Sequence, residues 1–311
     1  MDIYFRIIYG IVFVESINFA LPNKNSMKKT VLLLLISITL CGCSVLNDVA
    51  GTQIAGMISE TLTEQVTSRF ENLDPEAVAA ASNALASAVT ISDAQITALC
   101  SQYMASMDTT NVILPADDPY TIRLNRVMSR FKNVKKLKLN YAVYDDENTV
   151  NAFASGDGSV RVYTGLMDVM DDDELFAVIG HELGHLINKD VRDAYRTSYL
   201  VVATRYGISS FSEKAGTISL GFWGDLGDEL ANNAYSRHQE TKADEKAYQF
   251  CLDNDVDPFA MYRALNVLME IGGNNEEHSV MSNMFSSHPD TQKRAKHIKE
   301  LAEKDGYSLE D

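Results

Sequence analysis

The stretch that decides the fold runs from Glu174 to Ile187 and reads ELFAVIGHELGHLI. It is apolar on almost every side, which predicts a buried helix. Within it, His181 and His185 stand four residues apart, so a helix places both imidazoles on one face. Glu182 follows His181, close enough to reach a water molecule on an ion held by the two histidines. Two imidazole ligands, an open coordination position and a carboxylate base are the parts that a catalytic zinc site needs.

A second explanation of this helix is a pair of core histidines that hydrogen bonds satisfy. Two imidazoles and a carboxylate in a buried helix cost several kcal/mol unless they are paired or bound to a metal ion. Gly180 and Gly184 each cost about 1 kcal/mol in a helix interior, which predicts that the backbone of another element approaches this helix closely. Both costs favour the metal-site interpretation.

A catalytic zinc ion needs a third protein ligand. In the metzincin arrangement a third histidine follows His185 by six residues, but Val191 stands there, which excludes that branch. On a later predicted helix, Glu240 and Asp244 stand four residues apart and repel each other unless a cation is near. Glu240 can bind the metal while Asp244 accepts a hydrogen bond from a ligand imidazole and fixes its tautomer. A solvated acidic face is the alternative, and His238, on the other side of that helix, is a rival ligand.

Three short stretches that precede the helix at 174–187 are predicted to form strands. Apolar residues alternate in 137–144, and similar runs occur at 150–154 and 160–163. The segment 155–158 between the last two contains two glycines and predicts a hairpin turn. The acidic run at 171–174 predicts the start of the next helix, where the helix dipole favours negative charge.

A segment near the start of the chain is typical of exported proteins. Residues 27–42 carry two lysines, then an apolar run too short to span a bilayer, then Cys-Gly directly before Cys43. This resembles a bacterial lipoprotein signal peptide, with cleavage before Cys43 and a lipid on that cysteine. A short membrane anchor or buried helix is the alternative. Residues 1–26 precede a complete signal peptide and are either an over-extended start or a long n-region.

Charge and cysteine content limit the partners of the exported body. The net charge of −16 makes nucleic acid a poor partner. Removing residues 1–42 takes away two acidic and four basic residues and leaves −18, so a lipid rather than the protein's own charge would hold it to a membrane. Ser44, in place of Asp, indicates the outer membrane for such a lipoprotein. Cys100 and Cys251 either form one disulfide or stay as buried thiols.

Composition divides the rest of the chain. Residues 43–90 are rich in small and polar residues with helical spacing, which predicts a lipid-anchored helical spacer or a loosely packed helical pair. Residues 91–305 hold the motifs described above and are expected to form a zinc metallopeptidase domain. Residues 306–311 are expected to be a tail.

Two motifs taken together resemble a known family. The segments HELGH at 181–185 and SRHQETKAD at 236–244 resemble the HtpX and CAAX-prenyl-protease family of gluzincin metallopeptidases, and Cys43 indicates its lipoprotein branch. The resemblance covers about residues 91–303. It implies an α+β, mostly helical, zincin-like metallopeptidase fold with a small antiparallel sheet beside the active-site helix. It also implies one Zn²⁺ ion per chain.

The resemblance assigns roles to single residues. Zinc is expected on three ligands, His181, His185 and Glu240. Glu182 is then the general base, and Asp244 orients a ligand.

Two further segments match the family. A substrate backbone is expected to bind by strand addition to the residues of one strand, Asn151, Ala152, Phe153 and Ala154. The segment 286–294 resembles the family's His-Pro stretch, in which His288 either donates a hydrogen bond to the oxyanion or caps the zinc in a latent state. A plain helix start is the alternative.

The expected function is that of a zinc-dependent endopeptidase with Glu182 as base, which cleaves unfolded or extended envelope proteins in quality control. Its partners are protein or peptide substrates and, through the lipid on Cys43, the outer membrane facing the periplasm. A specific processing protease is a second enzymatic possibility. The alternative from another class is a lipoprotein with a latent metal site that acts as a chaperone or scaffold. The oligomeric state stays open.

Overall fold

The computed structural model describes six ranges: residues 48–69, 74–132, 134, 137–209, 235–273 and 288–309. The expected signal peptide at 27–42, the lipidation site Cys43 and residues 1–26 lie outside them and stay predictions. The described residues belong to two compact units, with residues up to 95 and 194–232 in one and residues 96–193 and 233–311 in the other. Two helices, α5 (Asp93–Thr110) and α9 (Asp190–Ser209), run from one unit into the other.

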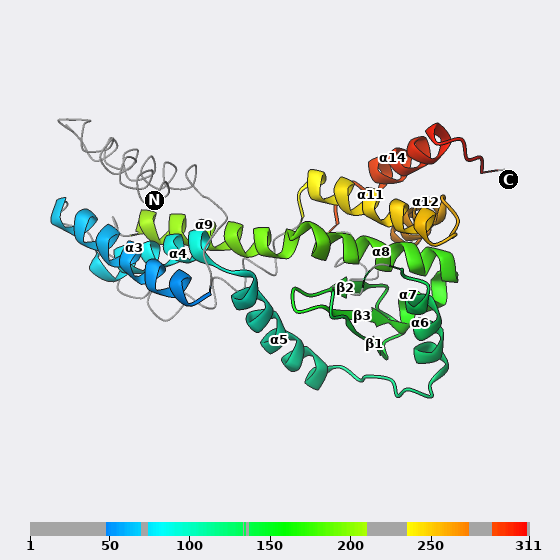
Figure 1. Ribbon diagram of the computed structural model, residues 1–311, viewed down its shortest axis with the longest axis horizontal. Coiled ribbons are helices and arrows are strands. Elements are labelled where there is room, and N and C mark those ends of the chain that lie inside the picture. Colours follow the sequence, from blue (N-terminus) through cyan, green and yellow to red (C-terminus); the bar gives the residue numbers. More distant parts are fainter. Residues whose placement is uncertain are drawn as a thin grey trace. The chain divides into compact units, whose positions relative to one another are not determined.

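The first unit contains a helical pair, α3 (Asp48–Arg69) and α4 (Pro75–Thr90), shown in Figure 1. The helices pack closely because one face of α4 consists of small buried residues, Ala77, Ala81, Ala84 and Ala88. Across the pair, Ser59 Oγ donates a hydrogen bond of 2.6 Å to Asn83 Oδ1. Of the two arrangements considered for residues 43–90, the described part forms the helical pair.

The second unit holds the sheet. Its strands are β1 (Asn140–Tyr144), β2 (Ala152–Ala154) and β3 (Ser159–Tyr163), in the order β1-β3-β2. The hairpin of β2 and β3 is antiparallel as predicted, and Gly158, with φ of 91°, makes its turn possible. β1 pairs with the other edge of β3 and runs parallel to it, so the sheet is mixed rather than wholly antiparallel. Alternation identifies a strand by its side-chain period but says nothing about its neighbour.

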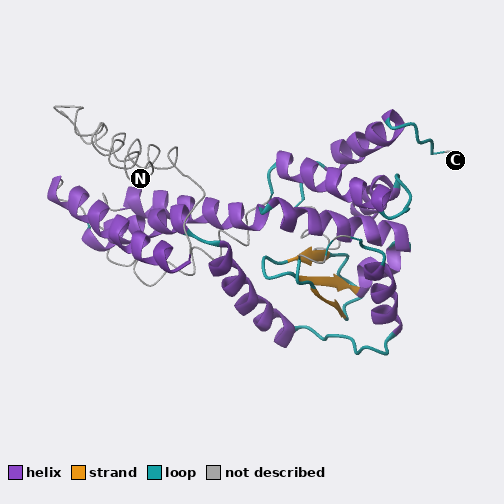
Figure 2. Ribbon diagram, viewed as in Figure 1, coloured by secondary structure: helices purple, strands orange, loops and turns teal. Residues whose placement is uncertain are grey.

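Helices α6 (Pro119–Ser129), α7 (Thr164–Val169) and α8 (Asp172–Asn188) lie against this sheet, and further helices pack on the far side of α8 (Figure 2). These are α11 (Arg237–Asp253), α12 (Ala260–Gly273) and α14 (Thr291–Lys304). α8 carries the decisive sequence motif and packs against α11, α12 and β2. It begins as predicted, because Asp171 and Glu174 form a capping box. The fold class, α+β and mostly helical, is confirmed.

The core of the second unit lies around α8. The face of α8 toward the sheet and α6 buries Leu175, Phe176, Ile179 and Leu183 completely. Phe176 stacks on Phe131 with ring centroids 3.9 Å apart. This packing fixes the rotation of α8 and therefore the direction in which its polar face points.

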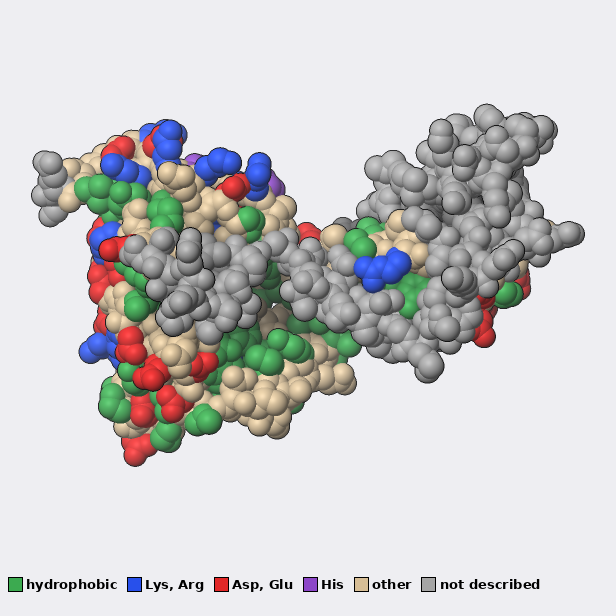
Figure 3. Space-filling model, turned by 180° about the vertical axis from the view of Figure 1, so that it is seen from behind, with side chains coloured by type: hydrophobic (Ala, Val, Ile, Leu, Met, Phe, Trp, Pro, Cys, Tyr) green, Lys and Arg blue, Asp and Glu red, His purple; other side chains and the backbone are tan. Residues whose placement is uncertain are grey.

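The surface over α11 and α14 carries Lys and Arg side chains (Figure 3). Lys242, Lys293 and Lys296 are exposed there, and each has an acidic partner three or four residues away on its own segment. Elsewhere in the second unit, Cys100 and Cys251 are buried thiols rather than a disulfide. Within the described residues, no helix combines the length and the apolarity needed to cross a membrane.

Candidate metal centre

Helix α8 carries three polar side chains into the interior of the second unit. His181, Glu182 and His185 are 2%, 3% and 1% exposed. The neighbouring helix α11 contributes Glu240 and Asp244, which are fully buried. Burial of so many ionisable groups is stable only if they are paired or bound to a cation.

Small residues bring the two helices together. A Cβ atom added to Gly184 would lie 3.0 Å from both Cα and the carbonyl oxygen of Ala243, and one added to Gly180 would lie 3.4 Å from Cα of Ala247. The predicted close approach of another backbone to these glycines is therefore confirmed. Ala243 and Ala247 share one face of α11 with Glu240, so the same contact turns Glu240 toward α8.

The candidate ligand atoms have the spacing of one small ion's coordination shell. The Nε2 atoms of His181 and His185 are 3.0 Å apart. Glu240 Oε2 lies 3.6 Å from His181 Nε2, and Glu240 Oε1 lies 3.4 Å from His185 Nε2. Tetrahedral zinc with bonds of 2.0–2.1 Å separates its ligand atoms by about 3.3 Å. The three residues thus fit one zinc ion between them.

The tautomers of the two histidines agree with this fit. His185 Nδ1 lies 2.7 Å from Asp190 Oδ2, and His181 Nδ1 lies 2.8 Å from Asp244 Oδ1. Carboxylates only accept hydrogen bonds, so each Nδ1 carries a proton and each Nε2 is the nitrogen that can offer a lone pair to a metal ion. Two lone pairs 3.0 Å apart repel, and a cation between them turns that repulsion into ligation.

One contact disagrees with this assignment. Arg294 Nη2 lies 3.3 Å from His181 Nδ1, and a guanidinium only donates. The shorter contact to Asp244 decides the tautomer, because Arg294 already forms two hydrogen bonds of 2.7 Å to that carboxylate.

Electrostatics within the cluster favour an anionic Glu240, a neutral His181 and a proton on His185 that a bound metal ion would displace. Burial and the nearby Arg294 hold the pKa of His181 well below its usual range. Burial lowers the pKa of His185, but the hydrogen bonds to Asp190 and Glu240 outweigh it and raise that pKa to about 9. Burial raises the pKa of Glu240, but hydrogen bonds from His185 and His288 hold it far below its ordinary value, so this carboxylate is ionised at neutral pH.

Glu182 points its carboxylate toward the ligand set. Its Oε2 accepts a hydrogen bond of 3.2 Å from the backbone N–H of Ala154 in β2. Its Oε1 is buried and has no hydrogen-bond partner among the described residues, and His288 Nε2 lies 3.6 Å from it. A buried carboxylate oxygen left in this way can accept the proton of a water molecule.

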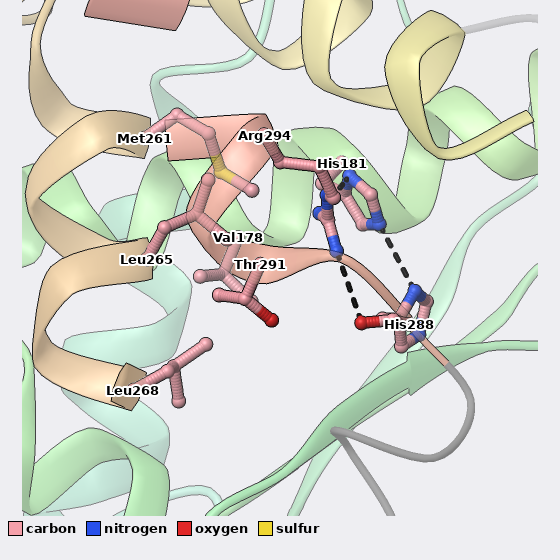
Figure 4. A pocket seen from close by; sticks show the side chains of 8 residues that line it. All are labelled: Val178, His181, Met261, Leu265, Leu268, His288, Thr291 and Arg294. Atoms are coloured by element: carbon pink, nitrogen blue, oxygen red, sulfur yellow. Dashed lines mark hydrogen bonds between the residues drawn. The ribbon is translucent and has the colours of Figure 1, made fainter. Parts of the chain in front are cut away.

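His288, just before α14, lies inside the ligand set. Its Nδ1 is 3.2 Å from His181 Nε2 and 3.0 Å from Glu240 Oε1. One ligand atom from each of four residues, His181, His185, Glu240 and His288, lies within 4.8 Å of all the others. Figure 4 shows the His288 ring facing His181. A zinc ion bound here would therefore have His288 available as a fourth ligand, in the place that catalytic zinc sites keep for water.

A small cavity adjoins His181 and His288 (Figure 4). Its walls are mostly apolar side chains of α8 and α12, Val178, Met261, Leu265 and Leu268. The volume is about 20 Å³, which is room for about one water molecule. In this state the cavity is too small for a substrate side chain.

Three residues of the site were not foreseen. Asp190 stands five residues after His185, but Lys189, with φ of 64°, ends α8 in a left-handed turn that folds Asp190 back onto the histidine. The Tyr235 ring stacks on His185 at 4.0 Å. Arg294 is buried against Asp244.

The remaining predicted residues are placed as follows. Ala152, Phe153 and Ala154 form β2 at the edge of the sheet nearest α8, and the carbonyl of Asn151 accepts a hydrogen bond from the Tyr163 amide. The rival ligand His238 is exposed on α11, away from the cluster.

Comparison with known proteins gives relatives for this arrangement. The model of peptidase family M48 matches residues 115–302, which include every candidate metal ligand. Metalloprotease LoiP of Escherichia coli (strain K12) is 32% identical over 237 residues, 76% of this chain and 92% of that protein. Metalloprotease YcaL of the same strain is 34% identical over 214 residues, 68% of this chain and 82% of that protein. A protease HtpX homolog of Sulfurihydrogenibium sp. (strain YO3AOP1) is 28% identical over 199 residues, 50% of this chain and 65% of that protein.

The family match spans more than half of the chain, and the match to LoiP spans nearly all of that relative. The resemblance read from the two sequence motifs is confirmed. The chain belongs to peptidase family M48, a family of zinc-dependent metalloproteases.

Proposed function

We propose that this protein is a zinc-dependent endopeptidase that cleaves extended or unfolded protein segments in the cell envelope. The observation that carries the proposal is the convergence of two imidazole lone pairs and the carboxylate of Glu240 beside the partnerless oxygen of Glu182. A structural metal site does not need a general base, so it would not require the buried carboxylate of Glu182.

In this mechanism His181, His185 and Glu240 hold the metal. When bound, Zn²⁺ lowers the pKa of a water molecule toward about 7 and polarises the substrate carbonyl. Glu182 Oε1 accepts the proton of that water and later delivers it to the leaving amine. The backbone N–H of Ala154 keeps the other oxygen of Glu182 in place, so the free oxygen faces the reaction.

The edge strand β2 offers a backbone for the substrate. The amide of Tyr163 donates to the carbonyl of Asn151, and the amide of Ser155 donates to the carbonyl of Ser159. The backbone N–H and C=O groups of the odd-numbered residues in this strand therefore point toward β3. The N–H and C=O groups of Ala152 and Ala154 therefore point outward, and Glu182 takes the Ala154 N–H. Two carbonyls and one N–H remain to form hydrogen bonds with an added substrate strand. Such bonds involve the substrate backbone rather than its side chains, so they favour unfolded segments.

His288 is assigned to a resting state. Its Nδ1 lies among the candidate ligand atoms, so a water molecule enters the fourth position only after His288 leaves it. Of the two roles considered for this residue, capping of the metal fits its place better than oxyanion stabilisation. Lipidation at Cys43, if it occurs, puts this site in the periplasm at the outer membrane, where quality control of envelope proteins is its task.

The test compares wild type with Glu182→Gln, both loaded with zinc to the same measured content, on unfolded casein. Glu245→Gln is the control, because Glu245 lies on α11 outside the cluster and pairs with Lys242. We expect cleavage by wild type and the control only. Equal cleavage by the Glu182 variant would overturn the assigned mechanism.

One observation favours a second function. His288 lies where a fourth ligand would bind, and a metal ion that kept this histidine would have no place for water, as a chaperone or scaffold with a latent metal would require. That function predicts client binding without cleavage by wild type and by Glu182→Gln alike. A narrow substrate profile would instead indicate a processing protease.

A further inference from the structure

Arg294 is a buried cation near the start of α14, and the backbone there fixes its position. It is 6% exposed and lies in the first turn of that helix. The chain turns into α14 at Asp290, whose φ of 63° is left-handed, and the amide of Arg294 donates to the Asp290 carbonyl at 3.1 Å. The side chain points toward His181 and His288 (Figure 4).

The guanidinium of Arg294 donates two parallel hydrogen bonds to the carboxylate of Asp244. Nε donates to Oδ2 and Nη2 to Oδ1, each at 2.7 Å. Such a fork fixes the plane of the carboxylate as well as its distance. Asp244 Oδ1 in turn lies 2.8 Å from His181 Nδ1. A continuous chain of contacts therefore runs from Arg294 through Asp244 to a candidate metal ligand.

The same guanidinium distinguishes the two oxygens of Glu240. Nη1 lies 2.6 Å from Oε2, whereas Oε1 lies 3.4 Å from His185 Nε2. His288 Nδ1 is close to both oxygens, at 3.0 Å from Oε1 and 3.2 Å from Oε2. A charged hydrogen bond to one carboxylate oxygen competes with a metal ion for the lone pairs of that oxygen. Because Oε2 is bonded to Arg294, Oε1 is the oxygen better placed to bind the ion.

Arg294 also touches the segment that carries the cap. Its Nη1 lies 3.4 Å from the carbonyl oxygen of His288. One side chain thus contacts the third ligand, the residue that orients the first ligand, and the backbone of the capping histidine.

We propose that Arg294 is the positioning residue of this metal site: it restricts Glu240 to one metal-binding oxygen and holds Asp244 where it orients His181. The inference rests on the proposed zinc site. A lysine would keep the charge but not the fork, because an ammonium cannot bind a carboxylate with two parallel N–H donors and reach Glu240 as well.

The experiment measures the Zn²⁺ affinity of the folded full-length chain by competition with a chromophoric chelator. The variants are Arg294→Met and Arg294→Lys. Arg161→Met is the matched control, because Arg161 is 2% exposed and forks onto Asp108 in the same unit, outside the metal site. We expect affinity to fall about 10–100-fold for the Met variant, by less for the Lys variant, and not at all for the control.

The absorption spectrum of the Co²⁺-loaded proteins is the second readout, since band intensity falls as coordination rises from four to five. Wild type and Arg161→Met should give the intense four-coordinate spectrum. Arg294→Met should give a weaker, five-coordinate one as Glu240 binds through both oxygens. A merely structural role would lower thermal stability without moving either readout.

The inference is overturned if both Arg294 variants keep wild-type Zn²⁺ affinity and the wild-type Co²⁺ spectrum. If Arg294→Met does not fold, Arg294→Lys decides alone, with the same two readouts. A wild-type chain that binds no Zn²⁺ would instead overturn the proposed function, so the two failures are distinguishable.

Discussion

Replacing Gly184 by alanine tests how the α8–α11 contact builds the site. Alanine normally stabilises a helix by about 1 kcal/mol over glycine. Here the new Cβ would lie 3.0 Å from the Cα atom and carbonyl oxygen of Ala243, which are backbone atoms and cannot rotate away. Overpacking of this kind costs about 1–3 kcal/mol, so we expect a net loss of up to about 2 kcal/mol.

The assay is thermal unfolding of the second unit, followed by zinc titration. For a unit of this size, each kcal/mol shifts Tm by about 2–4 °C, so Gly184→Ala should lower Tm by up to about 8 °C. Ala243 lies between Glu240 and Asp244 on α11, so its displacement moves both carboxylates. We therefore also expect zinc affinity to fall at least about tenfold.

Two other glycines serve as graded controls. At Gly180 the added Cβ meets Ala247 Cα at 3.4 Å, an ordinary contact, and at Gly56 in α3 it meets nothing within 4 Å. Gly180→Ala should change stability by less than about 1 kcal/mol, and Gly56→Ala should stabilise α3 slightly. If Gly184→Ala raises Tm and leaves zinc affinity unchanged, the close approach does not position the ligands.

Three more outcomes are expected. His288→Ala should raise kcat/KM on casein, since it frees the fourth position; a fall of about 10²-fold or more would instead identify His288 as an oxyanion donor. Chelation of zinc should lower Tm of the second unit and abolish casein cleavage, and added Zn²⁺ should restore both, because a metal that binds only the folded state stabilises it; unchanged values would contradict the metal site. The hydrogen bond from Arg161 holds the pKa of Asp108 below its ordinary 3.8, so this pair stabilises the fold above about pH 4 and less as pH falls. The Tm of Asp108→Asn should therefore lie below that of wild type at pH 7 and converge with it below pH 4, whereas a constant difference would refute the linkage.

The sequence predicted the elements of the site that depend on periodicity. Spacing of four placed His181 with His185, and Glu240 with Asp244, on single faces, and the structure brings both faces together. The cost of Gly184 in a helix predicted a close neighbour, which is α11. These features are local or follow from burial, so one sequence contains them.

The rest depends on tertiary contacts that periodicity does not encode. Asp190 reaches His185 only because Lys189 adopts a left-handed conformation, and nothing in the residue type lysine favours that. Arg294 appears in the sequence as one of several charged residues on a short helix. Its burial depends on how α14 packs against α11 and α12. The parallel partner of β1 was missed for the same reason.

X-ray absorption at the zinc edge of the resting full-length protein, together with its zinc content, would identify the metal and its ligands. We expect one zinc ion per chain with three imidazole nitrogens and one carboxylate oxygen at about 2.0–2.1 Å. These ligands would be His181, His185, His288 and Glu240. A protein without stoichiometric zinc, or a zinc ion with fewer than two imidazole ligands, would contradict this expectation.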